Sequence, residues 1–149
     1  MANVSAVMGA IELANSFIRT AEELQPEVEK AVNQAIILVE SSAKESIAQG
    51  PKSGKVYVKK GSNSAEHQAS AAGQAPANDT GNLSENIRTK LKRGKRVIGS
   101  VISKAPYSAA LEFGTKDIKP RPFMRPALMN NERIAIALIN KALKKAQND

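Results

Sequence analysis

The feature that most constrains this fold is a rigid stretch near the C-terminus, Ala105 to Pro126, which holds four of the seven prolines and three of the five aromatic residues. Gly114 can adopt the positive φ that ends a short helix formed by the residues before it. Pro120 and Pro122 fix φ near about −65° and disfavour the helical region for the residues that precede them. The sequence KPRPF is therefore predicted to be an extended, stiff strap. Pro126 fits the first turn of a following helix.

The aromatic side chains of this stretch have two interpretations. In the first, Tyr107, Phe113 and Phe123 form a docking element, with Arg121 and Arg125 beside them. In the second, both phenylalanines lie in the core of a plain strand-to-helix connection. We favour the docking interpretation, because a small domain rarely needs two aromatic residues and two prolines merely to enter a helix.

Two blocks of sequence resemble a known family. APYSAALEFGT followed by PRPFMRPAL, and HQASAAGQAPANDTGNLSENI from His67 to Ile87, resemble the signature of morphogenesis proteins from long-tailed double-stranded DNA phages. In that family a similar small-residue loop ends in TG-x-L-x-x-S/N-I. The order of the blocks and the flanking helices also match, over residues 26–147. The first 25 residues lie outside the resemblance.

The resemblance implies a structural role in the virion. Proteins of this family are described as tail-component, tail-completion or neck proteins, so we expect a protein of the head–tail junction or upper tail end. It would assemble in the host cytoplasm as a ring, expected to be hexameric. Its neighbours would be head-completion, tail-terminator or tail-tube proteins, with a possible passing contact with packaged DNA.

Composition narrows the classes of function. A chain of 149 residues is most simply one domain, residues 1–149, large enough for its own core. The absence of cysteine excludes disulfides, thiol nucleophiles and cysteine-based metal sites, and fits a reducing cytoplasm. We find no signal peptide and no 18-residue apolar run, so we expect neither secretion nor a membrane span.

The formal charge of +8 is unevenly distributed. Residues 1–50 hold seven acidic and three basic residues, a net −4, whereas residues 88–104 hold seven basic residues and no acidic one. Such a run predicts contact with a polyanion or with an acidic protein face. The alternative is a solvated edge strand that lysines protect from aggregation. The candidate interaction residues of this run are Arg88, Lys90, Lys92, Arg93, Lys95 and Arg96.

Hydrophobic periodicity predicts an α+β fold. It consists of two N-terminal helices, a long small-residue loop, a basic β-hairpin that forms a small antiparallel sheet (with a further short strand near Val56), and a C-terminal helix on that sheet. The expected bounds are helices over 4–24, 26–48 and 127–147, strands over 83–92 and 97–104, and a loop over 52–80.

The helices and the second strand carry more specific expectations. Pro26 should separate the first two helices, since proline fits the first position of a helix. The strand 97–104 is apolar on both faces and should be central or covered. The last helix is apolar all round over residues 134–139, so we expect the sheet and second helix, or a neighbouring subunit, to enclose it. The first helix has an apolar seam that would contact its own domain or another subunit: Val4, Val7, Ile11, Ala14, Ile18 and Ala21.

We expect no enzymatic activity and no cofactor or metal. The single histidine, His67, lies in the non-periodic loop, where no regular element would hold it against a nucleophile. Asp79 and Glu112 are the acidic residues of the motif blocks, and a hydrolase would have to use them, although an ion pair with Arg121 or Arg125 explains Glu112 equally well. The loop should stay mobile in the free subunit or order as an arm on a neighbour. The alternative function is that of a small basic DNA-binding protein with non-specific affinity.

Overall fold

The computed structural model describes the backbone of residues 4–58 and 66–148 and, within these, the side chains of residues 22, 24–58 and 66–145. The fold is α+β: helices combine with two separate two-stranded antiparallel sheets, β1–β2 and β3–β4. The elements are α1 (Val4–Gln49), β1 (Val56–Val58), β2 (Glu66–Gln68), α2 (Asn82–Glu85), β3 (Ile87–Lys92), β4 (Ile98–Ser103), α3 (Ser108–Phe113) and α4 (Met124–Asn148).

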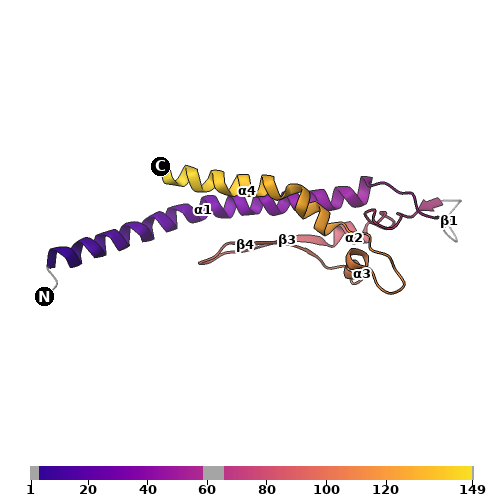
Figure 1. Ribbon diagram of the computed structural model, residues 1–149, viewed down its shortest axis with the longest axis horizontal. Coiled ribbons are helices and arrows are strands. Elements are labelled where there is room, and N and C mark those ends of the chain that lie inside the picture. Colours follow the sequence, from indigo (N-terminus) through magenta and orange to yellow (C-terminus); the bar gives the residue numbers. More distant parts are fainter. Residues whose placement is uncertain (1–3, 59–65, 149) are drawn as a thin grey trace.

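The helix α1 is the axis of an elongated molecule (Figure 1). The second long helix, α4, runs antiparallel along it, and the hairpin β3–β4 lies along another side of it. The short helices α2 and α3 and the hairpin β1–β2 gather at the C-terminal end of α1. The N-terminal part of α1 projects beyond both the hairpin and the end of α4. Among the described residues, no helix is both long and apolar enough to cross a membrane.

The expected break between two N-terminal helices is wrong, because α1 continues through Pro26. Proline removes one backbone hydrogen bond from a helix interior, at a cost of about 3 kcal/mol. Here Pro26 is exposed, so water can reach the carbonyl that loses its donor. Across the proline, Gln25 Nε2 donates to Glu29 Oε1 at 3.0 Å, and α4 packs alongside the following turns. The side chains of the predicted seam, from Val4 to Ala21, lie outside those that the structure describes.

The main core lies at the C-terminal half of α1. Residues at a spacing of four on α1, Val39, Ala43 and Ile47, face the hairpin and the start of α4, as the helical periodicity predicts. Phe123 and Ile87 fill the space between them and are almost completely buried. The remaining buried members of this cluster are Leu83, Ala105 and Ala127.

The predicted basic hairpin is present, but its second strand is not covered on both faces. In β3–β4, Lys92 pairs with Ile98 and Ile87 with Ser103, so the connection spans residues 93–97. The inner face packs on α1. The sheet has only these two strands, and nothing in the described chain covers its outer face, so Ile98 and Ile102 are 47% and 41% exposed.

The first predicted strand begins later than expected, because residues 82–85 form the helical turn α2. Gly81 takes a left-handed conformation at φ 82°, and the Asn78 side chain accepts its N–H at 2.9 Å. Leu83 and Ile87, which the alternating pattern assigned to one face of a strand, are both buried. Their spacing of four residues is equally compatible with a helical turn.

The small-residue loop is more ordered than its composition predicts, in the parts that the structure describes. The strand near Val56 exists, and it pairs with Glu66–Gln68 rather than joining the basic hairpin. The order comes from polar contacts: the side-chain oxygen Oε1 of Gln74 accepts the backbone N–H groups of Ser53 and Ala71, and Gly73 N–H donates to Pro120 O at 2.9 Å. These bonds hold residues 66–80 in one conformation in the structure, while mobility in the free subunit or ordering as an arm on a neighbour stays a prediction; residues 59–65 lie outside the described part.

The outer side of α4 is not enclosed within the subunit. The expectation that the sheet and the second predicted helix (residues 26–48) would surround residues 134–139 is wrong, since Ile134 and Ile136 are about half exposed. One side of α4 still packs on α1 through Ala127, Asn131 and Ala142. Enclosure by a second subunit is the alternative that remains.

Candidate functional site

The rigid stretch forms an elbow in which one carboxylate joins two helices. Gly114 ends α3 with φ 76°. The Glu112 carboxylate then accepts the backbone N–H groups of Phe123, Met124 and Arg125 at 2.8, 3.0 and 2.9 Å. These N–H groups open α4 and have no partner inside that helix, so Glu112 is its N-terminal cap and complements its dipole. The ion pair with Arg121 or Arg125, which was one explanation of Glu112, does not occur among the described residues, and the carboxylate forms this cap instead.

The two phenylalanines of the elbow have opposite environments. Phe123 is 1% exposed in the core, so in this subunit it cannot dock a partner as we expected. Phe113 is 76% exposed at the end of α3 and is the aromatic side chain that a partner could bury. Tyr107 is half-exposed, and its hydroxyl accepts a hydrogen bond from Asn82 Nδ2 at 2.9 Å. Arg125 is exposed at the start of α4.

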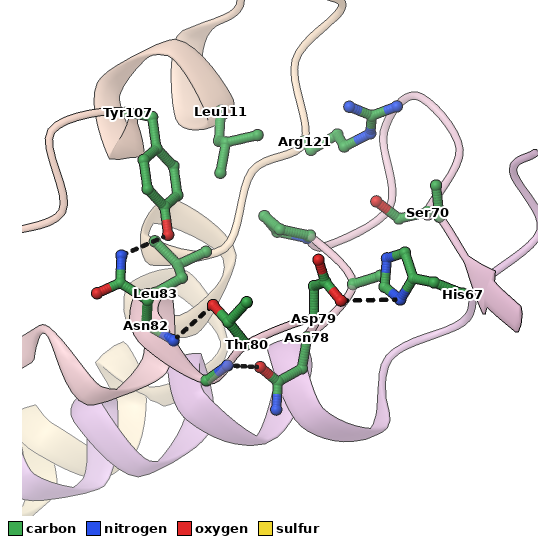
Figure 2. A pocket seen from close by; sticks show the side chains of 14 residues that line it. His67, Ser70, Asn78, Asp79, Thr80, Asn82, Leu83, Tyr107, Leu111 and Arg121 are labelled. Carbon is green, nitrogen blue, oxygen red and sulfur yellow. Dashed lines mark hydrogen bonds and ion pairs between the residues drawn. The ribbon is translucent and has the colours of Figure 1, made fainter. Parts of the chain in front are cut away.

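The two motif blocks meet in a pocket of about 300 Å³ beside the elbow (Figure 2). The first block contributes residues 67–83 of the loop and α2, and the second contributes Tyr107, Leu111 and Arg121. The backbone N–H of Arg121 donates to Leu111 O at 2.6 Å, which holds the proline strap against α3. No local sequence pattern predicted that these distant blocks would come together.

Most polar groups of the pocket bind one another. Asn78 and Thr80 accept the backbone N–H groups of Gly81 and Asn82. His67 Nδ1 lies 3.7 Å from Asp79 Oδ1, as Figure 2 shows. Arg121 Nε is buried and has no hydrogen-bond partner among the described residues. The pocket is therefore chiefly a connection between the loop and the elbow, with one arginine group left to bind an oxyanion.

The pocket also holds Ser70, His67 and Asp79, the residue types of a hydrolytic triad, which the sequence interpretation did not bring together. A nucleophile needs a hydrogen bond to its base, and the base a close bond to the group that orients it. Ser70 forms no hydrogen bond with His67 in the structure, and the separation of His67 from Asp79 exceeds hydrogen-bond distance. Within the described residues, no group of three potential metal ligands occurs. In this structure the three side chains do not form the hydrogen-bonded series of a triad.

Comparison with protein-family models, with curated proteins and with solved structures gives no match. The functional conclusion therefore depends on the sequence motifs and on two surfaces of the subunit, one basic and one apolar.

The basic surface covers the β3 side of the hairpin and its connection. Arg88, Lys90 and Lys92 alternate on the exposed face of β3, and Lys95 and Arg96 are exposed in the connection. Arg93 differs from these residues because its Nε donates to Glu29 Oε2 at 2.8 Å. Arg93 therefore attaches the hairpin to α1, and the other five cations remain available to a partner.

This attachment affects the Glu29 carboxyl group. The hydrogen bond from Gln25 is the main cause that lowers the pKa of Glu29 below its ordinary value; desolvation opposes it, and the hydrogen bond and charge of Arg93 make further, smaller contributions to the lowering. Glu29 therefore stays ionised under acidic conditions in which a free glutamate would begin to protonate.

The apolar surface is a groove of about 730 Å³ between the hairpin and α4, with α1 as its floor. Its floor is lined by residues between 32 and 39 of α1, and its walls are lined by residues between 97 and 101 of the hairpin and by Leu128, Ala135 and Ile139 of α4. Phe113 and Arg125 lie at the end of the groove near the elbow. The groove is continuous with the exposed side chains Ile98 and Leu128.

The groove and the cap both depend on contacts between residues far apart in the sequence, so local sequence patterns did not predict them. Glu112 lies more than ten residues before the helix that it caps, so it matches no local capping pattern. The groove depends on Gly99, which lets β4 approach Val32 and Ile36 of α1 closely. A glycine inside a strand is the one signal of such a close approach that the sequence offered.

Proposed function

We propose that this chain is a structural protein of the phage virion, at the head–tail junction or upper tail end, that works by assembling into a ring. It belongs with tail-completion or neck proteins in this proposal, and it performs no chemistry. The ring docks with head-completion, tail-terminator or tail-tube proteins above and below it.

The observation that supports assembly is the uncovered apolar groove. A soluble monomer rarely leaves large contiguous apolar surface in water, and such surface usually marks an interaction site. Here Phe113 and Leu128 are 76% and 56% exposed, and both line the groove. The resemblance of the two motif blocks to phage morphogenesis proteins supports the location in the virion.

Native mass spectrometry and negative-stain electron microscopy of the purified chain test the assembly. We expect one closed oligomer with a central opening, a hexamer by the resemblance. Immunogold labelling of particles from the phage that encodes the chain should then mark the neck or upper tail. A chain that stays monomeric throughout the micromolar range, or label absent from particles, would overturn the proposal.

The second candidate function is that of a small basic DNA-binding protein. The observation that favours it is the row of exposed cations on β3 and in the following connection. A protein that neutralises Z phosphates shows a slope of about −0.9Z when log affinity is plotted against log salt. A slope equivalent to several phosphates for the isolated subunit would favour this function, and no retention on DNA at physiological salt would exclude it.

A further inference from the structure

We infer that the apolar groove is filled by the N-terminal part of α1, residues 4–24, from a second copy of the chain. This inference deepens the proposed ring assembly and rests on it. It names the two surfaces that meet and makes the contact head-to-tail.

The first element is the N-terminal part of α1, whose backbone projects beyond the end of α4. Lys145 near the end of α4 lies 3.7 Å from Glu27 of α1, which places the end of α4 beside that residue. Only three residues of α4 follow Lys145, whereas α1 extends 23 residues from Glu27 back to Val4. At 1.5 Å per residue, roughly 30 Å of α1 project beyond α4. This is the projecting indigo segment in Figure 1.

The second element is an apolar groove long enough to hold about three turns of that helix. Along its α4 wall, Leu128 and Ile139 are separated by 11 residues, about 16 Å or three helical turns. A helix bound in a groove uses anchors at spacings of three, four and seven residues. The projecting segment has this spacing in its seam, for instance at Val7, Ile11 and Ala14.

The charges of the two elements are opposite. Residues 4–24 hold three acidic residues and one basic residue, a net −2. The groove has Arg125 at one end, and at the other its lining begins at Val97, directly after the exposed Arg96. Complementary charge of this kind guides association and fixes its orientation.

The geometry requires a second copy rather than the same chain. The floor of the groove belongs to α1 itself, and α1 is one continuous helix from Val4 to Gln49. Its own N-terminal part therefore leads away from the groove and cannot enter it. A contact between two different surfaces of identical subunits is heterologous, and it closes into a ring when the rotation per subunit allows closure.

Two charged substitutions in the full chain test the inference by mass photometry. Ile11→Asp places a charge in the apolar seam of the projecting helix, and Leu128→Asp places a charge in the groove. Leu128 is 56% exposed, so the fold should tolerate its substitution. Each variant alone should associate at least about 30-fold more weakly than the parent, the effect of losing an interface hot spot. A 1:1 mixture should form dimers and nothing larger, because only one intact helix and one intact groove can meet.

Matched controls and a crosslink complete the test. Asn130→Asp lies exposed on the same helix as Leu128 but outside the groove, and Ser16→Asp lies outside the apolar seam; both should assemble as the parent does. Because the chain has no cysteine, Ile11→Cys combined with Leu128→Cys should give disulfide-linked oligomers without background.

The outcomes separate this inference from the proposed function. Rings that persist in both aspartate variants, or a mixture that yields no dimer, would overturn the inference and leave ring assembly intact. A parent chain that is monomeric at all concentrations would overturn both. If that monomer nevertheless enters particles and Leu128→Asp prevents its entry, the groove binds a different protein.

Discussion

At the scale of single residues, Glu112 connects two helices. Its carboxylate binds three consecutive N–H groups at the start of α4, while its backbone belongs to α3. The same elbow is held by the bond from Arg121 N–H to Leu111 O. Glu112 therefore fixes the angle at which the chain enters α4, and with it the position of Phe113 at the groove.

We predict that Glu112→Ala lowers the free energy of unfolding by about 2 kcal/mol, since a cap is typically worth about 1 kcal/mol and charge-assisted bonds are worth more. Glu112→Gln, which keeps one acceptor oxygen, should lose less. Urea denaturation followed by circular dichroism measures both. The control is Glu132→Ala, which removes an exposed acidic residue of α4, the helix that Glu112 caps. Equal unfolding midpoints for Glu112→Ala and the control would contradict the assigned cap.

Gly99 gives a second prediction for a single residue. A Cβ at this position would lie 2.5 Å from Ile36 Cγ2 and 2.7 Å from Val32 Cγ1. Gly99→Ala should therefore push the hairpin away from α1 and destabilise the subunit by about 1–3 kcal/mol, as overpacked cores do. Ser100→Ala, the next residue on β4, should stay close to the parent in the same thermal melt. A Gly99→Ala variant as stable as the parent would show that the hairpin is not seated on α1.

Local signals predicted elements better than they predicted contacts between elements. The end of α1 at Gly50, the basic hairpin and the last helix were all visible in periodicity and in glycine and proline positions. The predicted helix break at Pro26 was wrong because proline removes a local hydrogen bond, whereas α1 is stabilised there by packing of α4, which is distant in the sequence. The order of residues 66–80 was missed because it depends on Gln74 and on a bond to Pro120, which no window of sequence contains.

At the scale of elements, the two phenylalanines of the elbow have different roles, which the sequence did not distinguish. Phe123 belongs to the core and Phe113 to the surface. We predict that Phe123→Ala costs about 3–5 kcal/mol and leaves little soluble protein. Phe113→Ala should melt almost like the parent but assemble more weakly. Thermal melts and mass photometry of the two variants distinguish these effects, and an unfolded Phe113→Ala would contradict its surface role.

The attachment of the hairpin to α1 predicts a pH dependence. The pKa of Glu29 is lowered in the folded state, so its contribution to stability is present above the ordinary value of 4.5 and is lost as the pH falls through the folded value. In an NMR titration, Gln25→Ala should raise the Glu29 pKa most and Arg93→Ala should raise it less. Lys95→Ala should leave it unchanged. A Glu29 that titrates identically in all three variants would contradict this attachment.

At the scale of the whole molecule, charge and apolar surface are arranged along one axis. The first 50 residues are net acidic, and the hairpin, which lies along the same helix, is strongly basic. The apolar groove lies between the hairpin and α4. An elongated subunit with an acidic end and a basic, apolar flank is suited to head-to-tail contacts between copies.

This arrangement gives the last prediction, which concerns the basic surface. Lys92, Lys95 and Arg96 are exposed and form no ion pair with described residues, whereas Arg93 pairs with Glu29 and must be left intact. Reversing these three residues to Glu changes the formal charge from +8 to +2, since each reversal removes two units. The subunit should still fold, because exposed charges contribute little to stability. Ring formation should fail or require lower salt.

The matched control reverses Lys116, Lys119 and Lys141, which are also exposed, and reaches the same net charge away from the hairpin. If the effect is specific to the hairpin, the control assembles normally while the hairpin variant does not. If the cations instead contact DNA, the salt slope of DNA retention falls by about three phosphate contacts and subunit assembly is unchanged. Normal rings and an unchanged slope in the hairpin variant would leave the cations only the role of protecting an exposed strand edge from aggregation.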